Sequence, residues 1–101
     1  MFFIYILYSH TADRYYVGHT NDVARRLKDH NEGERPLQST KYTFKHRPWK
    51  LMASFPISED RGTTMKVEKY IKGRKSRTFL KELILHQHDI EKIAQLVRVP
   101  F

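Results

Sequence analysis

The amino-terminal segment is a run of large apolar and aromatic residues, Phe2-Phe3-Ile4-Tyr5-Ile6-Leu7-Tyr8. A continuous run of this kind is typical of a strand that is buried on both faces. A polar connection over residues 9–14 leads to Tyr15-Tyr16-Val17, which predicts a second strand with Gly18 at its exit. Because the link is short, the two strands are expected to pair as an antiparallel hairpin.

A helix is predicted over residues 22–31, where polar side chains at positions 20–22 supply oxygens for its first amides and Gly33 ends it. Val23 and Leu27 share one stripe of this helix. Arg26 and His30 are also four residues apart, so they share a second stripe beside it. The helix therefore presents one apolar face and one polar face next to each other.

The rest of the chain predicts one more strand and three more helices. Residues 34–48 are polar and basic and favour a long loop, and residues 49–55 alternate as a strand that Pro56 closes. A helix follows over residues 58–72, with Ser58 as its cap and Gly73 at its end, and Ser76 and Asp89 can cap two further helices. This order predicts an α+β fold, a small three-stranded antiparallel sheet flanked by helices, as one domain over residues 1–101.

Composition narrows the function. The net charge is +8, which favours a polyanionic partner such as nucleic acid. Cysteine is absent, which excludes a disulfide framework, a thiolate metal site and a cysteine nucleophile. No apolar stretch approaches the roughly 20 residues of a membrane span. The amino-terminal run lacks the features of a signal peptide, so a cytoplasmic location is expected.

Five residues then carry a resemblance to a known family. Tyr5 ends Phe3-Ile4-Tyr5, and Tyr16 begins Tyr16-Val17-Gly18 after ten intervening residues. Arg26 follows Tyr16 by ten positions, His30 follows Arg26 by four, and Glu68 lies within the predicted helix over residues 58–72. In order and spacing, residues 2–84 resemble the GIY-YIG endonucleases, and most of all the small stand-alone bacterial members.

Three departures from the family pattern are visible. Phe3 stands where the first motif has glycine, and Val17 stands where the second has isoleucine. Neither position supplies a functional group. Some family members also carry a functional asparagine late in the domain, whereas this chain has only Asn21 and Asn31.

The resemblance implies a metal-dependent endonuclease that hydrolyses DNA phosphodiester bonds, in a process such as repair or recombination. It makes Glu68 the ligand of Mg²⁺ or Mn²⁺, and a hard carboxylate oxygen suits either ion. Tyr5 and Tyr16 would handle the attacking water, with Tyr5 as general base. Arg26 would stabilise the charge of the transition state, and His30 would orient a tyrosine, relay a proton or contact phosphate.

DNA is the expected partner, and the protein is expected to be a monomer or a weak dimer. A further set of residues is expected to contact the nucleic acid: Gly18, Arg25, Lys41, Tyr42, Lys45, Arg47 and Lys72. For Gly18 the expected contribution is a close approach of the backbone or a positive φ. The others are basic or aromatic residues that suit phosphate-tracking surfaces.

Other interpretations of these residues stay open on the sequence alone. Glu68 and Lys72 are four residues apart, as in an ordinary exposed ion pair on a helix. Either tyrosine suits a core position with a satisfied hydroxyl, which is the interpretation preferred for Tyr8 and Tyr15. A nucleic-acid binding module of the same fold with little or no catalysis, or a basic domain that binds proteins, would also fit this charge.

Overall fold

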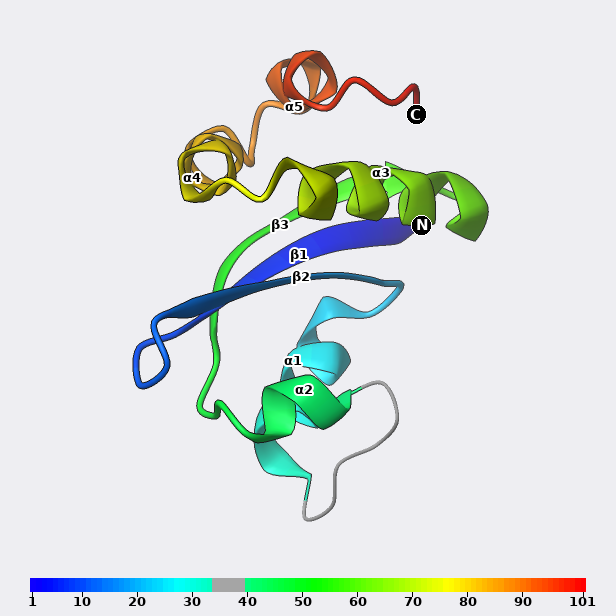
Figure 1. Cartoon of the computed structure of the whole chain (residues 1–101). Coiled ribbons are helices and arrows are strands. Elements are labelled where there is room, and N and C mark those ends of the chain that lie inside the picture. Colours follow the sequence, from blue (N-terminus) through cyan, green and yellow to red (C-terminus); the bar gives the residue numbers. More distant parts are fainter. Residues whose placement is uncertain (34–39) are drawn as a thin grey trace.

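A three-stranded antiparallel sheet forms the middle of the protein (Figure 1). The computed structural model describes residues 1–33 and 40–101. The strands are β1 (Phe2–Ser9), β2 (Arg14–Thr20) and β3 (Lys50–Ser58), in the order β2-β1-β3. The predicted hairpin of β1 and β2 is confirmed, and β1 lies between two partners, which explains its continuous apolar run.

Helices cover both faces of the sheet. On one face lie α1 (Val23–Glu32) and the short α2 (Lys41–Phe44) (Figure 1). On the other lie α3 (Arg61–Arg74), α4 (Arg77–Leu85) and α5 (Ile90–Leu96). The predicted α+β fold is therefore confirmed. No helix within the described part of the chain is long and apolar enough to cross a membrane.

Alternation along β1 divides the core into two parts. Ile4 and Ile6 face the larger core beneath α3, α4 and α5. Tyr5 and Leu7 face a smaller core on the α1 side, together with Trp49. The apolar stripe predicted for α1 packs there, since Val23 and Leu27 contact this smaller cluster. Tyr5 is thus placed on the α1 face of the sheet by the strand period alone.

The third strand is longer than expected. The prediction that Pro56 closes it is wrong, because β3 continues to Ser58 and Pro56 pairs with Phe3. β3 is hydrogen-bonded to β1 alone and so forms an edge of the sheet. A proline, which has no amide hydrogen to donate, is tolerated within an edge strand.

The helix predicted over residues 58–72 is displaced along the chain. α3 begins at Arg61 because the Asp60 carboxylate, and not Ser58, accepts the Thr63 amide at 2.9 Å. The Ser58 hydroxyl accepts the amide of Asp60 itself, also at 2.9 Å. Gly73 does not end the helix, which runs to Arg74 before Lys75 adopts a left-handed conformation with φ 49°.

The loop expected over residues 34–48 contains α2, which the sequence did not predict. Residues 34–39 of that loop lie outside the described part of the chain. The predicted caps at the other helices are confirmed, since the side chains of Asp22, Ser76 and Asp89 each accept an amide at the start of α1, α4 and α5.

Candidate active site

A cleft of about 490 Å³ opens at the outer edge of β2. Because β2 is an edge strand, side chains from both faces of the sheet meet there. Tyr5 and Tyr16 reach the cleft from the α1 side, and Glu68 reaches it from α3. The remaining lining residues are Phe2, His19, Thr20, Asn21, Arg26 and Arg61. Four of the five residues that carry the family resemblance therefore line one cleft, and the fifth, His30, lies directly behind it.

The strand register brings the two tyrosines together. Tyr5 pairs with Gly18 across the hairpin, and Leu7 pairs with Tyr16. Tyr16 is therefore the diagonal neighbour of Tyr5 on the same face. Their ring centroids are 6.3 Å apart. The geometry of the hairpin therefore places the two rings side by side.

Gly18 leaves the space that the Tyr5 ring occupies. A Cβ at position 18 would lie 2.4 Å from the Tyr5 hydroxyl oxygen and 2.6 Å from Cζ of the same ring. Glycine is therefore required here by close approach. The alternative expectation of a positive φ is wrong, because no described glycine has one.

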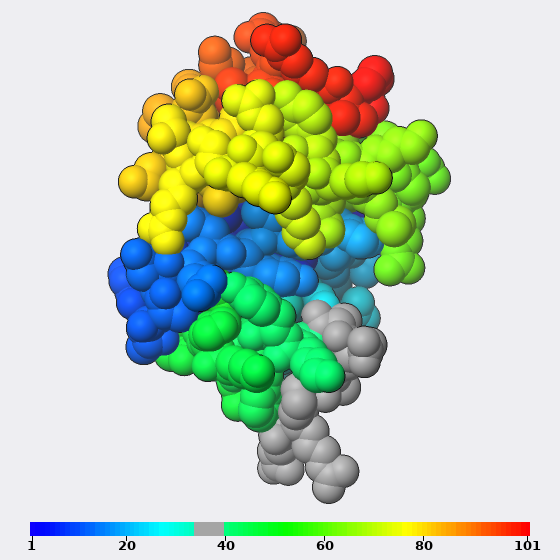
Figure 2. All heavy atoms as spheres, viewed as in Figure 1, coloured from blue at the N-terminus to red at the C-terminus, as the bar shows by residue number. Residues whose placement is uncertain are grey.

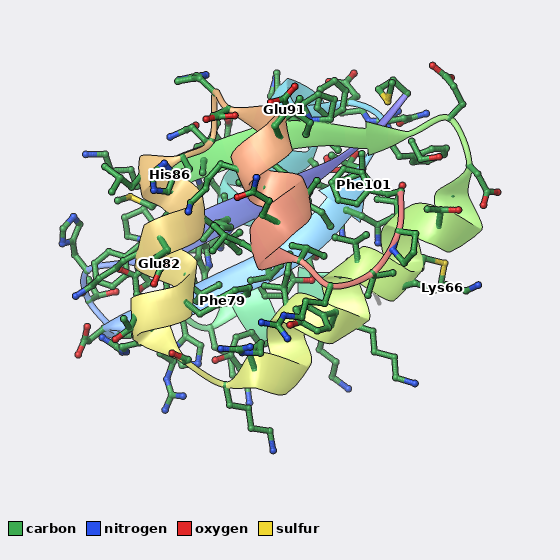
Figure 3. All side chains as sticks on the ribbon, turned by 90° about the horizontal axis from the view of Figure 1, so that it is seen from above. Lys66, Phe79, Glu82, His86, Glu91 and Phe101 are labelled. Carbon is green, nitrogen blue, oxygen red and sulfur yellow. The ribbon has the colours of Figure 1, made fainter. Side chains whose placement is uncertain are left out.

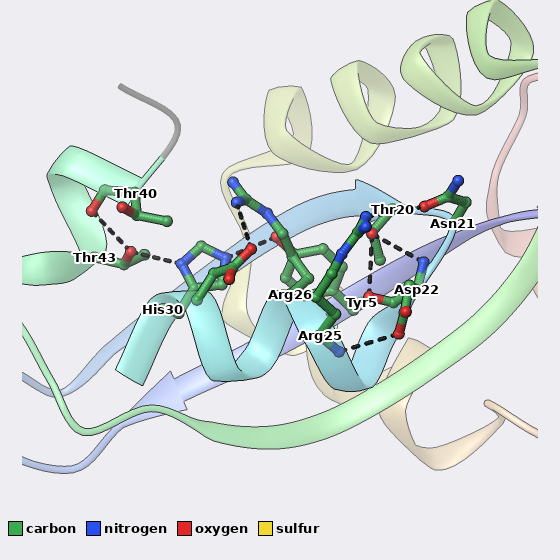
Figure 4. Close-up of polar contacts among 10 residues, drawn as sticks. Tyr5, Thr20, Asn21, Asp22, Arg25, Arg26, His30, Thr40 and Thr43 are labelled. Carbon is green, nitrogen blue, oxygen red and sulfur yellow. Dashed lines mark hydrogen bonds and ion pairs between the residues drawn. The ribbon is translucent and has the colours of Figure 1, made fainter. Parts of the chain in front are cut away.

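A buried line of hydrogen bonds runs from Tyr5 away from the cleft (Figure 4). The Tyr5 hydroxyl lies 2.8 Å from His30 Nε2, and His30 Nδ1 lies 2.6 Å from Thr43 Oγ1. Thr43 Oγ1 in turn donates to the carbonyl of Thr40 at 3.1 Å. His30, Thr43 and Thr40 are all buried.

The carbonyl of Thr40, which can only accept, determines which groups donate and which accept along this line. The Thr43 hydroxyl has one hydrogen, which goes to the Thr40 carbonyl, so its oxygen accepts from His30 Nδ1–H. His30 Nε2 then carries a lone pair and accepts the hydroxyl hydrogen of Tyr5. With this tautomer the Tyr5 hydroxyl donates to His30, and its oxygen accepts hydrogen bonds from the cleft side, where Arg26 lies.

The electrostatics of the line keep both groups neutral near pH 7. Burial, assisted by the charge of Arg26, lowers the pKa of His30 to about 4. Burial and the neighbouring Tyr16 raise the pKa of Tyr5 above its ordinary value, whereas the charge and hydrogen bond of Arg26 oppose that rise. His30 is thus an uncharged acceptor, and Tyr5 is a donor that does not ionise unaided.

Arg26 lines the cleft and lies beside Tyr5 and His30 (Figure 4). Its side chain is 16% exposed, and its guanidinium lies 3.6 Å from the Asp29 carboxylate. Arg25, by contrast, is exposed and donates to Asn21 Oδ1 at 3.3 Å, outside the cleft lining. The predicted difference between the two arginines is therefore seen in their positions.

Glu68 is held from two sides at the opposite wall of the cleft. Its Oε1 lies 2.6 Å from His19 Nδ1, and its Oε2 lies 2.8 Å from Lys72 Nζ. Arg61 Nε donates to His19 Nε2 at 3.3 Å, so His19 Nδ1 carries the hydrogen that Glu68 accepts. The ion pair with Lys72 and the position in the cleft, which the sequence offered as alternatives, occur together.

The donor set suits a hard divalent ion. No cluster of three or more histidine, cysteine or acidic side chains that could hold a metal occurs in residues 1–33 and 40–101. The chain would therefore supply one carboxylate, and water or substrate oxygens would complete the coordination. Mg²⁺ is commonly bound in this way, through one or two carboxylates with retained waters.

The other residues expected to contact nucleic acid are spread over the surface. Lys41, Tyr42 and Lys45 are exposed on or beside α2, and Tyr42 stacks against Tyr16 with ring centroids 6.3 Å apart. Arg47 differs from expectation, because its guanidinium donates to the carbonyls of Asn31 and Gly33 at 3.1 and 2.7 Å. Those bonds hold the end of α1, and the phosphate contact expected for Arg47 stays a prediction.

Sequence reasoning missed His19, Arg61 and Thr43. His19 had a usable signal, since strand alternation places it on the face opposite Tyr16 and Gly18, which is the face that α3 covers. Thr43 had none, because it lies in the unpredicted α2. Asn31, too early for the family's late asparagine, binds the backbone of Trp49 through both ends of its amide.

Comparison with known proteins agrees with this geometry. The profile of the GIY-YIG catalytic domain matches residues 1–81. The UPF0213 protein YazA of Bacillus subtilis (strain 168) is 35% identical over 86 residues, which cover 85% of this chain and 80% of YazA. No solved structure matches the chain significantly.

The fold and the cleft define a nuclease-type domain. Since the family profile covers most of its length, the chain belongs to the GIY-YIG family. Members of this family generally use a divalent metal ion, and DNA is the substrate that a domain of this type implies.

Enlarging Gly18 should displace the Tyr5 ring. Gly18→Ala is expected to lower the free energy of unfolding by about 1–3 kcal/mol, as overpacking of a filled site does. The loss should shrink in a Tyr5→Ala background, because the clashing ring is then absent. Urea denaturation of the four proteins measures both values, and equal losses in the two backgrounds would contradict this account of Gly18.

The buried neutral His30 predicts a specific pH dependence of stability. The unfolded chain takes up a proton at His30 near pH 6.5, whereas the folded chain resists until about pH 4. The unfolded state therefore binds more protons in this window, and the free energy of unfolding falls as pH decreases from 6.5 towards 4. His30→Gln should flatten that fall, whereas His88→Gln, at an exposed position, should keep the wild-type slope. Urea denaturation of the wild type and both variants between these two pH values measures the slopes.

Proposed function

We propose that this protein is a metal-dependent endonuclease that hydrolyses DNA phosphodiester bonds at the cleft beside β2. The observation that supports this most is the line from Tyr5 to His30 and Thr43, which ends in the cleft that Arg26 and Glu68 also line. A setting in DNA repair or recombination, where strands are cut, is part of the same proposal.

The attacking water needs a group that accepts its proton. In the proposed reaction, the water donates to the Tyr5 oxygen while the Tyr5 hydroxyl passes its own proton to His30 Nε2, 2.8 Å away. Because the two transfers occur together, no free phenolate is required, and the raised pKa of Tyr5 is no obstacle. His30 keeps its Nδ1–H bond to Thr43 throughout. After the bond to phosphorus has formed and the bond to the leaving oxygen has broken, His30 returns its proton to Tyr5, and the hydrogen that Tyr5 took from the water passes to the leaving oxygen through solvent in the cleft.

Negative charge develops on the phosphate oxygens during the attack. Arg26 lies in the same cleft as Tyr5, and a guanidinium stays charged and matches phosphate geometry. The imidazolium formed at His30 adds a second positive charge behind Tyr5. A divalent ion held by Glu68 would supply further charge stabilisation and would assist the leaving oxygen. Tyr16 forms the wall between the cleft and the exposed Tyr42.

Removing the carboxylate of Glu68 tests the metal requirement. Cleavage of supercoiled plasmid and of labelled single-stranded and branched DNA would be measured at low salt with Mg²⁺ or Mn²⁺. Glu68→Gln is expected to lower the rate roughly 100-fold or more, and EDTA should abolish cleavage by the wild type. Glu82→Gln is the matched control, because Glu82 is an exposed carboxylate on α4 that does not line the cleft (Figure 3).

The outcomes of this assay separate the candidate functions. Cleavage that survives Glu68→Gln would contradict the assignment of the metal ligand. Binding without cleavage on every substrate would favour a nucleic-acid binding module of the same fold. Direct titration with Mn²⁺, followed by electron paramagnetic resonance, reports metal binding to the wild type and to Glu68→Gln independently of cleavage.

Removing one hydroxyl tests the general base. Tyr5→Phe keeps the buried ring but deletes the group that joins the water to His30, so the cleavage rate should fall roughly 100-fold or more. Tyr8→Phe deletes an exposed hydroxyl that binds Asp13 at 2.6 Å and should leave the rate unchanged. Single-turnover rates at saturating protein isolate the chemical step. Equal rates for the two variants would exclude the proposed relay.

A further inference from the structure

A second pocket, of about 480 Å³, lies on the far side of Tyr16 from the cleft. Its walls come from the outer edge of β2, from α2 and from the connection between α3 and α4. Figure 2 shows these three segments meeting on one face, with residues 70–80 above the blue segment that includes β2 and with α2 below it. Its basic and aromatic lining residues include Arg14, Tyr16, Tyr42, Lys72, Lys75 and Arg77.

The charge of this pocket has one sign. Four of its lining side chains are basic, and none of the described lining residues carries a carboxylate. Lys72 is paired with Glu68, and Arg77 with Asp13. Arg14 and Lys75 form no ion pair with residues 1–33 or 40–101. Two cations therefore face the pocket without a compensating anion from the described chain, which favours a ligand that carries phosphate.

The aromatic wall points to a second component of the ligand. Tyr42 is 46% exposed although its side chain is large and apolar. Its ring is inclined by only 24° to that of Tyr16, so the two present nearly parallel faces. Exposed aromatic faces beside basic groups are the surfaces on which unpaired bases stack. A surface that contacts only the phosphates of a duplex would not require an exposed aromatic face.

The pocket adjoins the cleft at Tyr16, and Lys72 of the pocket reaches Glu68 of the cleft. Tyr16 lines both, and Lys72 Nζ lies 5.3 Å from the centroid of the Tyr16 ring while it binds Glu68. A strand that leaves the cleft past Tyr16 brings its next nucleotide to the pocket. The position of the pocket beside the cleft and the chemistry of its lining residues therefore both indicate a nucleotide as its ligand.

We propose that this pocket binds an unpaired nucleotide next to the scissile phosphate, with its base on Tyr42 and its phosphate at Arg14 and Lys75. The inference rests on the proposed function, because it takes the cleft as the place of the scissile phosphate. A base within a duplex has both faces covered by its neighbours and cannot stack on Tyr42. The substrate class is therefore a strand that is unpaired beside the cut.

The test compares two single strands of equal charge. One is an ordinary labelled DNA oligomer, and the other has the same length and phosphates but no bases. Affinities are measured by fluorescence anisotropy in EDTA, so that no cleavage occurs. The wild type should bind the strand with bases about tenfold more tightly, which is the scale of one stacked base. Tyr42→Ala should bind the two strands equally.

Three variants make the result specific. Tyr42→Trp keeps an aromatic face and should keep the preference for bases. Phe101→Ala removes another exposed aromatic ring, at the carboxyl-terminal end, which lies above α3 and away from the sheet (Figure 1), and should change nothing. Arg14→Ala combined with Lys75→Ala should weaken binding to both strands and lower its dependence on salt, because phosphate contacts are lost.

The outcomes distinguish this inference from the proposed function. A wild type that binds both strands equally, a preference that survives Tyr42→Ala, or a duplex bound as tightly as the single strand with bases would each overturn the pocket. Cleavage of the same oligomers with Mg²⁺ is scored separately. Cleavage combined with any of those binding results leaves the nuclease and removes the pocket, whereas a Tyr42-dependent preference without cleavage leaves the pocket and removes the nuclease.

Discussion

The hydrogen bond between Tyr5 and His30 connects the sheet to α1 and sets the chemistry of the cleft. It joins residues that are almost fully buried, where an unsatisfied polar group would destabilise the fold. Gly18 leaves the space for the Tyr5 ring, and Thr43 satisfies the other nitrogen of His30. No buried side-chain nitrogen or oxygen within the described residues lacks a partner. The line is therefore fixed by the fold before any substrate arrives.

The open edge of β2 explains how two separate layers contribute to one site. A strand in the middle of a sheet separates the side chains on its two faces, but at an edge they meet around the backbone. Tyr16 and His19 come from opposite faces of β2, and both line the cleft. His19 then binds Glu68 from α3, 49 residues further along the chain. The edge that leaves β2 unpaired on one side thus also brings α1 and α3 to the same opening.

Structural features that depend on residues close together in the sequence were predicted correctly. The hairpin follows from the apolar run and its short connection, and the caps at Asp22, Ser76 and Asp89 follow from side-chain oxygens at helix starts. Pro56 was misjudged because its tolerance depends on β3 being an edge strand, which no local pattern reveals. Ser58 and Asp60 both offer an oxygen near the start of α3, and only the geometry shows which one caps it.

Within the site, the same division applies. The resemblance to the GIY-YIG endonucleases implied a common site for Tyr5, Tyr16, Arg26 and Glu68, and the fold brings the four residues to one cleft. The contact of His30 with Thr43 was out of reach, since α2 has only four residues and too little periodicity to detect. The bonds of Arg47 to the end of α1 were not predicted, for a related reason. A basic residue in a polar segment resembles a phosphate contact until its partners, here the carbonyls at the end of α1, are known.

The functions of the cleft and of the neighbouring pocket can be distinguished only at residues that belong to one of them alone, and Lys72 shows why. Its ammonium group binds Glu68 and lies over Tyr16, so a change at Lys72 alters the carboxylate, the aromatic wall and the charge of the pocket together. A loss of function there would not identify its cause. Tyr42, Arg14 and Lys75 line the pocket but not the cleft, whereas Arg26 lines the cleft but not the pocket. Effects confined to the first group can therefore be attributed to the neighbouring nucleotide, and effects at Arg26 to the reacting phosphate.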